Sequence, residues 1–407
     1  MVNQLPQGWK EEELGKLVDI FDNLRKPVSS TERLARIKNK DKSELYPYYG
    51  ATGLVDYIDG YIFDGEYLLL GEDGCPFLDS LKDKAYIISG KTWVNNHAHV
   101  LRAKENKTSN KFLLYYLNKF DYNGIVSGAT RLKLNQNSMK KIPVYYPTDK
   151  SEQEYIVKTL DAVAEIIRLR KENIQLTKDL IPAIFHEMFG DPITNPKGWE
   201  ILSLDNIITQ INNGYNPSKK DFGTGIPFVT VNNLYDGLSI DYDSLDKVMV
   251  SNKQIQKYKL NYGDICFVRS SVKREGIGQA SAYLSNQDAI FGGFVIRVTP
   301  KETFNPIFLS EYFQTESMRN IIINKSVTGV MTNINQPALL SIPVLNVPFS
   351  MQEEFADKVE QINKYIAAQQ EELEQFETLF QSLLQEAFTG VLTWNYPRKE
   401  CHDKKDK

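Results

Sequence analysis

The fold is decided by a stretch that occurs twice, first as Asn135-Gln136-Asn137-Ser138-Met139-Lys140-Lys141-Ile142-Pro143-Val144 and again as Asn335-Gln336-Pro337-Ala338-Leu339-Leu340-Ser341-Ile342-Pro343-Val344. A proline turn follows each copy, at Pro147 or Pro348, and a long helix-favouring run then ends at Gly190 or Gly390. Both halves also begin alike, with Gly8-Trp9 and Gly198-Trp199. Matches at a nearly constant offset indicate a duplicated unit. The predicted plan is therefore mixed segment, helix, mixed segment, helix.

The two helical runs carry apolar residues at alternating steps of four and three, which is the pattern of a coiled-coil seam. The seam residues are Ile156, Leu160, Val163, Ile167, Ile174, Ile181, Ile184 and Met188 in the first run, and Phe355, Val359, Ile362, Ile366, Leu373, Phe376, Phe380 and Leu383 in the second. The alternative is a pair of unrelated core helices, but the length and the shared endings favour mutual pairing. Arg170 and Gln369 interrupt the two seams at equivalent positions, where a polar residue can fix the register of an antiparallel pair.

Each mixed segment alternates short β-type runs with turn residues. In the first segment we expect a loop at 46–53, strands at 57–63 and 67–70 with breaks at Gly60, Gly65 and Gly71, further strands at 85–90 and 99–102, and a short helix at 112–117. In the second we expect strands at 227–231, 264–269 and 294–298 and a helix at 307–319. The small polar loops Ser127–Arg131 and Thr328–Thr332 are interpreted as counterparts. Two homologous α+β domains with divergent loops would have this pattern.

Composition is that of an ordinary soluble globular protein, with 407 residues, 42% hydrophobic and 25% charged. The N-terminus is polar and no apolar run is long enough for a membrane helix, so a cytoplasmic location is expected. Cys75, Cys266 and Cys401 are scattered singly, which fits neither a disulfide framework nor a zinc site. The net charge of −4 is concentrated in the helical runs. The two mixed segments can therefore carry basic faces, and DNA binding is not excluded.

No catalytic constellation is visible in the sequence. It has neither a phosphate-binding loop nor a dinucleotide-binding glycine motif, and the Asn/Asp-Pro-Pro-aromatic signature of amino-methyltransferases is missing. The histidines have no metal-ligand spacing, and His97 and His99 are interpreted as surface or satisfied core residues. The acidic cluster of Asp64, Glu66, Glu72 and Asp73 contains glycines and is interpreted as a turn. We expect neither catalytic nor metal-binding residues.

These marks, in their duplicated order, resemble the specificity subunit of type I restriction-modification enzymes. The resemblance covers residues 5–394 and includes two further segments, Met188-Phe189-Gly190-Asp191-Pro192 and Glu386-Ala387-Phe388-Thr389-Gly390-Val391-Leu392-Thr393-Trp394. It implies an α+β fold, with two homologous target recognition domains of mixed α/β structure separated by an antiparallel two-helix coiled coil with pseudo-two-fold symmetry. The implied boundaries are 1–146 and 191–347 for the domains, 147–190 and 348–394 for the spacer helices, and 395–407 for a charged, disordered tail.

The resemblance also implies a function. Such a chain would be the non-catalytic DNA sequence-specificity subunit, binding a bipartite asymmetric site on double-stranded DNA. Its partners would be two methylation subunits, which are adenine-N6 methyltransferases, and restriction subunits. S-adenosylmethionine would lie on the methylation subunit, ATP and Mg on the restriction subunit, and no cofactor on this chain. The alternatives are a coiled-coil scaffold that touches no DNA, and a nuclease or methyltransferase in its own right.

DNA contacts are expected from loops in which hydrogen-bond donors lie beside basic residues. In the first domain these are Tyr48, Tyr49, Thr52, Lys91, Asn95, Asn96, Ser127, Thr130 and Arg131. In the second they are Asn212, Asn213, Tyr215, Asn232, Asn233, Arg269, Ser270, Lys273, Arg274, Thr328 and Thr332. For any one of them, an ordinary turn or surface residue is the alternative interpretation.

Overall fold

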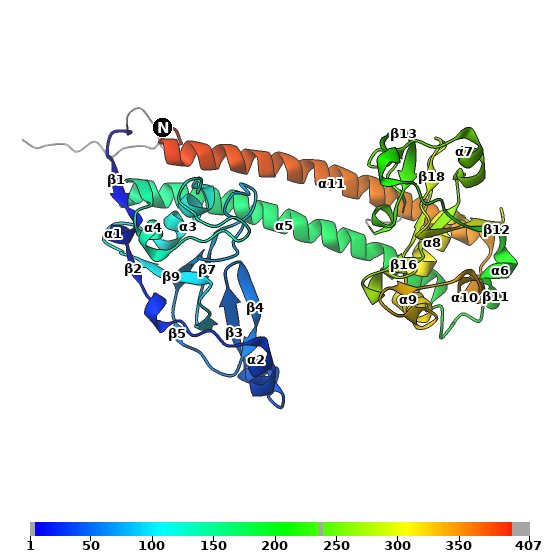
Figure 1. Cartoon of the computed structure of the whole chain (residues 1–407), viewed down its shortest axis with the longest axis horizontal. Helices are drawn as coiled ribbons and strands as arrows, with labels where there is room; N and C mark the ends of the chain where they lie inside the picture. Colours follow the sequence, from blue (N-terminus) through cyan, green and yellow to red (C-terminus); the bar gives the residue numbers. More distant parts are fainter. Residues whose placement is uncertain (1–4, 236–238, 393–407) are drawn as a thin grey trace, which may run out of the picture. The chain divides into compact units, whose positions relative to one another are not determined.

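Two long helices run through the chain, α5 (Lys150–Phe189) with 40 residues and α11 (Phe349–Thr389) with 41 (Figure 1). The computed structural model describes residues 5–235 and 239–392, so the predicted tail at 395–407 lies outside the described part. The chain divides into two units, one from 1–170 with 372–407 and the other from 171–371. Each unit holds one mixed α/β domain and part of each long helix. Among the described residues, none of the helices is both long and apolar enough to cross a bilayer.

The long helices pair in the way that the heptads predict. In the first unit, Ile156 and Leu160 near the start of α5 share a core with Leu384 near the end of α11. In the second unit, Phe185 near the end of α5 contacts Phe355 near the start of α11. The start of each helix therefore packs with the end of the other, which is antiparallel pairing. Every predicted seam residue is buried or half-buried.

The two polar interruptions of the seam are incompletely satisfied. Arg170 forms an ion pair with Glu372, and its guanidinium lies 4.7 Å from the centre of the Phe376 ring. The Arg170 Nε atom is buried without a hydrogen-bond partner among the described residues. In the second unit Gln369 is only 7% exposed, and its Oε1 atom likewise has no described partner. A buried polar atom without a hydrogen-bond partner costs free energy, so these two atoms oppose the stability that the apolar seam contributes.

The first domain is built on a four-stranded antiparallel sheet in the order β2-β9-β6-β7. A second sheet has the order β4-β3-β8-β5, and β1 pairs with β10. The elements are β1 (Trp9–Glu13), α1 (Leu14–Leu17), β2 (Val18–Ile20), η1 (Asp22–Leu24), α2 (Ser30–Ile37), η2 (Lys42–Glu44), β3 (Tyr46–Gly50), β4 (Gly53–Ile58), β5 (Phe63–Asp64), β6 (Tyr67–Gly71), β7 (Ala85–Ile88), β8 (Lys91–Val94), β9 (Ala98–Ala103), α3 (Asn110–Lys119), α4 (Gln136–Lys140) and β10 (Pro143–Pro147).

The second domain repeats this arrangement with a sheet in the order β12-β19-β15-β17, and β11 pairs with β22. Smaller sheets have the orders β14-β13-β18 and β16-β21-β20. The elements are β11 (Glu200–Ser203), α6 (Leu204–Ile207), β12 (Ile208–Asn213), η3 (Lys219–Asp221), β13 (Phe222–Val229), η4 (Val231–Leu234), β14 (Asp246–Val248), α7 (Asn252–Tyr258), β15 (Ile265–Val268), β16 (Ser270–Ser271), η5 (Arg274–Gly276), β17 (Ala280–Ala282), β18 (Ile290–Phe291), β19 (Val295–Pro300), α8 (Pro306–Gln314), α9 (Glu316–Asn324), β20 (Val327–Thr328), β21 (Thr332–Asn333), α10 (Gln336–Leu340) and β22 (Pro343–Asn346).

The repeated Asn and Ile-Pro residues make the same hydrogen bonds in both domains, including those from the Leu14 and Leu204 N–H groups to the Ile142 and Ile342 carbonyls. Asn135 and Asn335 cap α4 and α10, each accepting a hydrogen bond from a backbone N–H three residues on. The Pro143 and Pro343 carbonyls accept the hydroxyls of Tyr116 and Tyr312, at 2.7 and 2.9 Å. The duplication is therefore a repeat of hydrogen bonds as well as of amino-acid sequence.

The two repeats also end alike, at glycines with φ near +78° and +77°, Gly190 and Gly390. A Cβ atom at Gly190 would collide with Pro196, and one at Gly390 with Pro6. The start of the second repeat therefore covers the end of α5, and the start of the chain covers the end of α11. Only glycine combines this backbone conformation with the space available.

Two local predictions need correction, those of a loop at 46–53 and of a single helix at 307–319. The predicted loop at 46–53 contains strand β3, which pairs with β4 and, in parallel, with β8. The predicted strand segment 57–63 is divided between β4 and β5, with residues 59–62 outside both, which confirms the expected break at Gly60. The predicted helix at 307–319 is two helices, because Thr315 ends α8 and caps α9 by accepting a hydrogen bond from the Met318 N–H. The pairing of β3 with β8 joins Tyr48 to Trp93, which no local pattern relates, whereas Thr315 caps a helix only three residues from its donor.

Candidate nucleic-acid interface

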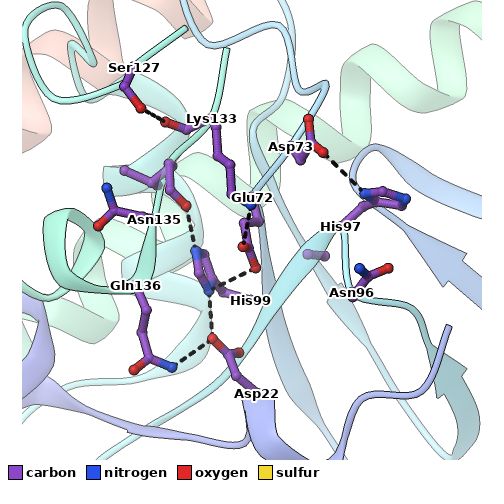
Figure 2. A network of polar contacts seen from close by, with 12 residues as sticks. Asp22, Glu72, Asp73, Asn96, His97, His99, Ser127, Lys133, Asn135 and Gln136 are labelled. Atoms are coloured by element: carbon purple, nitrogen blue, oxygen red, sulfur yellow. Dashed lines mark hydrogen bonds and ion pairs between the residues drawn. The ribbon is translucent and has the colours of Figure 1, made fainter. Parts of the chain in front are cut away.

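A buried charged network lies at the ends of β6 and β9 in the first domain (Figure 2). His99 has no exposed surface; its Nδ1 lies 2.7 Å from Asp22 Oδ2 and its Nε2 lies 2.8 Å from the Leu134 carbonyl oxygen. A carbonyl oxygen can only accept a hydrogen bond, and so can an ionised carboxylate. Both ring nitrogens therefore donate, and the ring carries a positive charge. His99 therefore holds Leu134, which follows the predicted DNA-contacting loop at Ser127–Arg131.

The Asp22 carboxylate matches this charge. Burial raises its pKa, but the hydrogen bond and charge of His99 and hydrogen bonds from Gln136 and the Val100 N–H outweigh burial, so that the pKa of Asp22 is lowered. The Gln136 Nε2 atom lies 2.9 Å from Asp22 Oδ2, and the Val100 N atom 2.9 Å from Oδ1. Asp22 is therefore ionised at neutral pH.

The ligand atoms of Asp22, Glu72 and His99 lie within 4.8 Å of one another, which raises the possibility of a metal site. Arg25 already lies 2.7 Å from Glu72 and 3.5 Å from Asp22, and Lys133 lies 3.4 Å from Glu72. These cations neutralise both carboxylates, and both His99 nitrogens are used. We interpret the group as an ion-pair network that anchors loop 127–133.

Loop 127–133 is closed by reciprocal backbone hydrogen bonds of 2.9 and 2.7 Å between Ser127 and Lys133. Arg131 Nε lies 2.5 Å from Asp73 Oδ1, and His97 Nδ1 lies 3.5 Å from Asp73 Oδ2. Asp73 therefore connects this loop to the turn that carries His97 and the exposed Asn96 (Figure 2). The Arg131 side chain remains 60% exposed, so this surface offers donors next to a carboxylate acceptor.

The second domain keeps the backbone of this site and changes its side chains. The Ile334 N–H donates to the Arg269 carbonyl as the Leu134 N–H donates to that of Glu72, so Arg269 takes the position of Glu72 and Ser270 that of Asp73. The Gly292 N–H donates to the Val229 carbonyl as the Asn95 N–H donates to the Tyr49 carbonyl, so Gly292 corresponds to Asn95. Two residues further along each chain segment, Phe294 therefore corresponds to His97. Ile296 takes the place of His99 by strand register.

The same correspondence corrects the expected match between the two small loops. Val327 pairs with Asn333 as Ser127 pairs with Lys133, so the offset is 200 throughout. Thr328 therefore corresponds to Gly128 and Thr332 to Leu132, one position away from the expected match. At this offset Met331 takes the place of Arg131.

A hollow of about 590 Å³ occupies this part of the second domain. Its lining includes exposed apolar side chains, with Val272 81% and Phe294 56% exposed. Lys273 also lines the hollow, and Arg274 next to it is exposed. The full lining is Val231, Asn232, Tyr235, Ser270, Ser271, Val272, Lys273, Glu275, Gly276, Phe294 and Met331.

Most of the predicted contact residues of the first domain are accessible. Thr52, Lys91, Asn96, Ser127, Thr130 and Arg131 are exposed, and Tyr49 is half-buried. Tyr48 is only 2% exposed, its hydroxyl accepts a hydrogen bond from the Val28 N–H, and the Arg33 guanidinium lies 4.4 Å from its ring centre. Asn95 is buried and accepts a hydrogen bond from the His97 N–H. Tyr48 and Asn95 are therefore buried beneath the exposed residues and support the backbone of this surface through these hydrogen bonds.

In the second domain, Asn213, Asn232, Lys273, Arg274 and Thr328 are exposed, and Asn212, Tyr215, Asn233 and Arg269 are half-buried. Asn212 accepts a hydrogen bond of 2.6 Å from Arg297, and Asn233 accepts one of 2.8 Å from the Thr230 N–H. Ser270 and Thr332 are buried, and Ser270 is hydrogen-bonded to Asn333. Asn232, Ser270 and Lys273 meet at the hollow.

Sequence reasoning missed Asp73, His97 and Lys133 in the first domain and Val272, Phe294 and Met331 in the second. Asp73 had been interpreted as part of a turn and His97 as a surface or core residue. Aligning the two repeats at the offset of 200 could have identified two of them, Lys133 and Met331, because Arg131 corresponds to Met331 and Lys133 to Asn333 in that alignment.

Curated relatives resemble parts of this chain. A protein of Haemophilus influenzae that carries the name of a type I restriction enzyme specificity subunit is 37% identical over 158 residues, which is 39% of this chain and 37% of the relative. The EcoKI specificity subunit of Escherichia coli is 26% identical over 200 residues, 47% of this chain and 43% of the relative. Each match thus spans less than half of the relative's length.

Solved structures resemble the chain along almost its whole length. The S subunit of a type I restriction-modification system from M. genitalium aligns over 95% of this chain and 97% of its own, with a TM-score of 0.53 and 14% identity. A chain from a structure of an assembled type I system aligns over 96% of this chain and 100% of its own, with a TM-score of 0.56 and 17% identity. At these identities the likeness establishes the fold. The family model of the type I restriction modification DNA specificity domain matches residues 6–178 and again 196–378, and the chain therefore belongs to this family.

Proposed function

We propose that this chain is the DNA sequence-specificity subunit of a type I restriction-modification system, and that each domain reads one half of a bipartite, asymmetric DNA site. The observation that supports this most directly is the pair of equivalent sites. Their backbone hydrogen bonds match, with Leu134 N to Glu72 O at 2.8 Å and Ile334 N to Arg269 O at 3.0 Å, while the surrounding side chains differ. Two domains with the same backbone arrangement and different surface side chains are suited to binding two different half-sites.

The exposed donors suit the chemistry of DNA recognition. Contacts to phosphate position a protein on the duplex, and contacts to base edges specify the sequence. Arg131 in the first domain and Lys273 and Arg274 in the second are exposed cations beside polar loops. The overall charge of −4 does not oppose this proposal, because the acidic excess lies in the helical runs.

We assign catalysis to partner subunits. Two methylation subunits would dock on the helical part of the chain and transfer a methyl group from S-adenosylmethionine to a flipped adenine. Restriction subunits, with ATP and Mg, would complete the nuclease. The polar cluster around His99 supports this division of roles, because its carboxylates are neutralised by Arg25 and Lys133.

The test is a selection from random duplexes by the chain assembled with its methylation subunits, repeated with Arg131→Ala and Arg274→Ala. The intact complex should enrich a two-part site. Each alanine variant should lose selectivity at one position of one half-site, by about 1 to 3 kcal/mol for a base contact. A uniform loss over all sequences would identify a phosphate contact instead, and enrichment of no sequence by the intact complex would exclude the proposal.

A further inference from the structure

The equivalent sites of the two domains differ in one consistent way. Around the position of Arg131 the first domain is charged, with Asp73 2.5 Å from Arg131 and His97 3.5 Å from Asp73. At the matching positions the second domain has Met331, Ser270 and Phe294. An ionic site in one domain thus corresponds to an apolar site in the other.

The ionic site has donors and an acceptor side by side. Asp73 holds the Nε atom of Arg131 and so limits the directions in which the exposed guanidinium can point. In the major groove, arginine donates to O6 and N7 of guanine, and a carboxylate accepts from the N4 amino group of cytosine. The ion pair therefore presents the groups that a G·C pair requires. Near phosphates an unpaired carboxylate would be repelled, and here the neighbouring cations offset that repulsion.

The apolar site is unusual for a surface exposed to water. Val272 is 81% exposed and Phe294 56% exposed on the hollow of about 590 Å³, and Met331 also lines it. Among the described residues there, Lys273 and Arg274 outnumber the one acidic side chain, Glu275, and leave the neighbouring surface with an excess of positive charge, which favours a polyanion over an apolar protein surface. The major-groove edges of A, G and C offer only hydrogen-bonding groups, whereas thymine also offers its C5-methyl group. The hollow therefore matches a thymine methyl.

We propose that the two half-sites differ at these equivalent positions, with a G·C pair read by Arg131 and Asp73 in the first domain and an A·T pair read through its thymine methyl by Val272, Phe294 and Met331 in the second. This inference rests on the proposed function, since it names the bases that the proposed DNA-binding surfaces select. It makes Asp73 a positioning residue for Arg131 as well as an acceptor for cytosine.

The test uses modified bases in the selected duplex, with the chain in complex with its methylation subunits. Half-sites are first assigned to domains by the positions at which Arg131→Met with Asp73→Ser, or Met331→Ala with Val272→Ala, lose selectivity. Replacing the assigned thymine by uracil removes only a methyl group and should weaken binding by about fourfold. Replacing the assigned guanine by 7-deazaguanine removes only N7 and should weaken binding by about tenfold. In Arg131→Met with Asp73→Ser, 7-deazaguanine should no longer weaken binding, whereas uracil should still do so. In Met331→Ala with Val272→Ala, uracil should no longer weaken binding, whereas 7-deazaguanine should still do so.

Matched controls exist in both domains. Lys82→Met with Asp79→Ser breaks another exposed ion pair of the first domain, and Met249→Ala removes another exposed apolar side chain of the second. In both control variants, uracil and 7-deazaguanine should weaken binding as much as they do in the wild type. Selection of a two-part site with no response to either modified base would overturn this inference while leaving the proposed function intact. If Met331→Ala instead weakened assembly with the methylation subunits and left the thymine effect unchanged, the hollow would be a protein-docking surface and the inference would be wrong. Failure of the unmodified complex to select any sequence would exclude both.

Discussion

At the residue scale, Asp22 and His99 form a buried ion pair, and removing one charge leaves the other without its partner. The Asp22 side chain is only 7% exposed. Asp22→Asn should therefore lower the free energy of unfolding at pH 7 by about 3 kcal/mol, as is typical when one member of a buried pair is removed. Urea denaturation measures this. Asp64→Asn, at an exposed position on β5, is the control and should have little effect; equal losses in both variants would contradict the assignment.

The same pair predicts an acid limit for the first domain. The pKa of Asp22 is lowered in the folded state, so its contribution is fully present above the unfolded pKa of about 3.9 and is lost as pH falls through the lower folded pKa. The difference in stability between wild type and Asp22→Asn should therefore shrink below about pH 4. A difference that stayed constant down to pH 2 would show that Asp22 does not act through its charge.

Glu311 predicts the opposite dependence in the second domain. It occupies the position of Tyr115, since each precedes the tyrosine that donates to a proline carbonyl. Burial raises the pKa of Glu311 to about 7. Because the folded pKa is above the unfolded value, stability is complete below about pH 4.5 and falls as pH rises toward 7. Glu311→Gln should be more stable than wild type at pH 8, by about 2 kcal/mol, and should lack this pH dependence. Glu302→Gln, at an exposed position, should keep the wild-type pH profile, and a similar profile in Glu311→Gln would contradict the prediction.

At the scale of elements, the polar seam residues of α5 and α11 should lower stability while fixing register. Gln369 Oε1 is buried without a described partner, which costs about 1 to 3 kcal/mol. Arg170→Leu combined with Gln369→Leu should therefore raise the melting temperature. It should also allow more than one register, visible as several cross-link patterns between single cysteines placed on the two helices. Gln361→Leu, at an exposed position of α11, controls for added hydrophobicity. A lower or unchanged melting temperature with a single register would contradict this prediction.

The elements that sequence predicted well are those whose signals are local. Steps of three and four residues predicted that the two helices pair, and the family resemblance implied that the pair is antiparallel. Ile142-Pro143 with Ile342-Pro343 indicated the duplicated frame. Strand β3 was missed although its partner β4 follows directly in the chain; its other partner, β8, lies more than forty residues away and leaves no local signal. The ion pair between Asp73 and Arg131 was missed for the same reason. Exposed donors such as Asn96 and Arg274 were predictable from loop composition, whereas the burial of Tyr48 depends on α2 residue Arg33 above its ring.

At the scale of the whole molecule, the duplicated frame and the divergent sites have separate roles. The contacts that repeat, such as the hydrogen bonds from tyrosine hydroxyls to the Pro143 and Pro343 carbonyls, join α3 to β10 and α8 to β22 inside the two domains. The positions that differ, such as Arg131 and Met331, lie in loops with exposed side chains. In our proposal, substitutions in these loops change the selected bases without disturbing the frame, and the length of the helices can change without altering the loops.

This separation gives the last prediction. Inserting one heptad in α5 after Lys171, with a matching heptad in α11 after Gln370 to keep the seam in phase, lengthens each helix by about 10 Å. That length corresponds to about three base pairs along the duplex, at roughly 3.4 Å each. In our proposal the helices set the spacing between the half-sites, so the selected spacer should lengthen while both half-site sequences stay the same. Selection from random duplexes measures both features at once. A variant with exchanged half-site bases and an unchanged spacer would show that the helices do not determine the spacing.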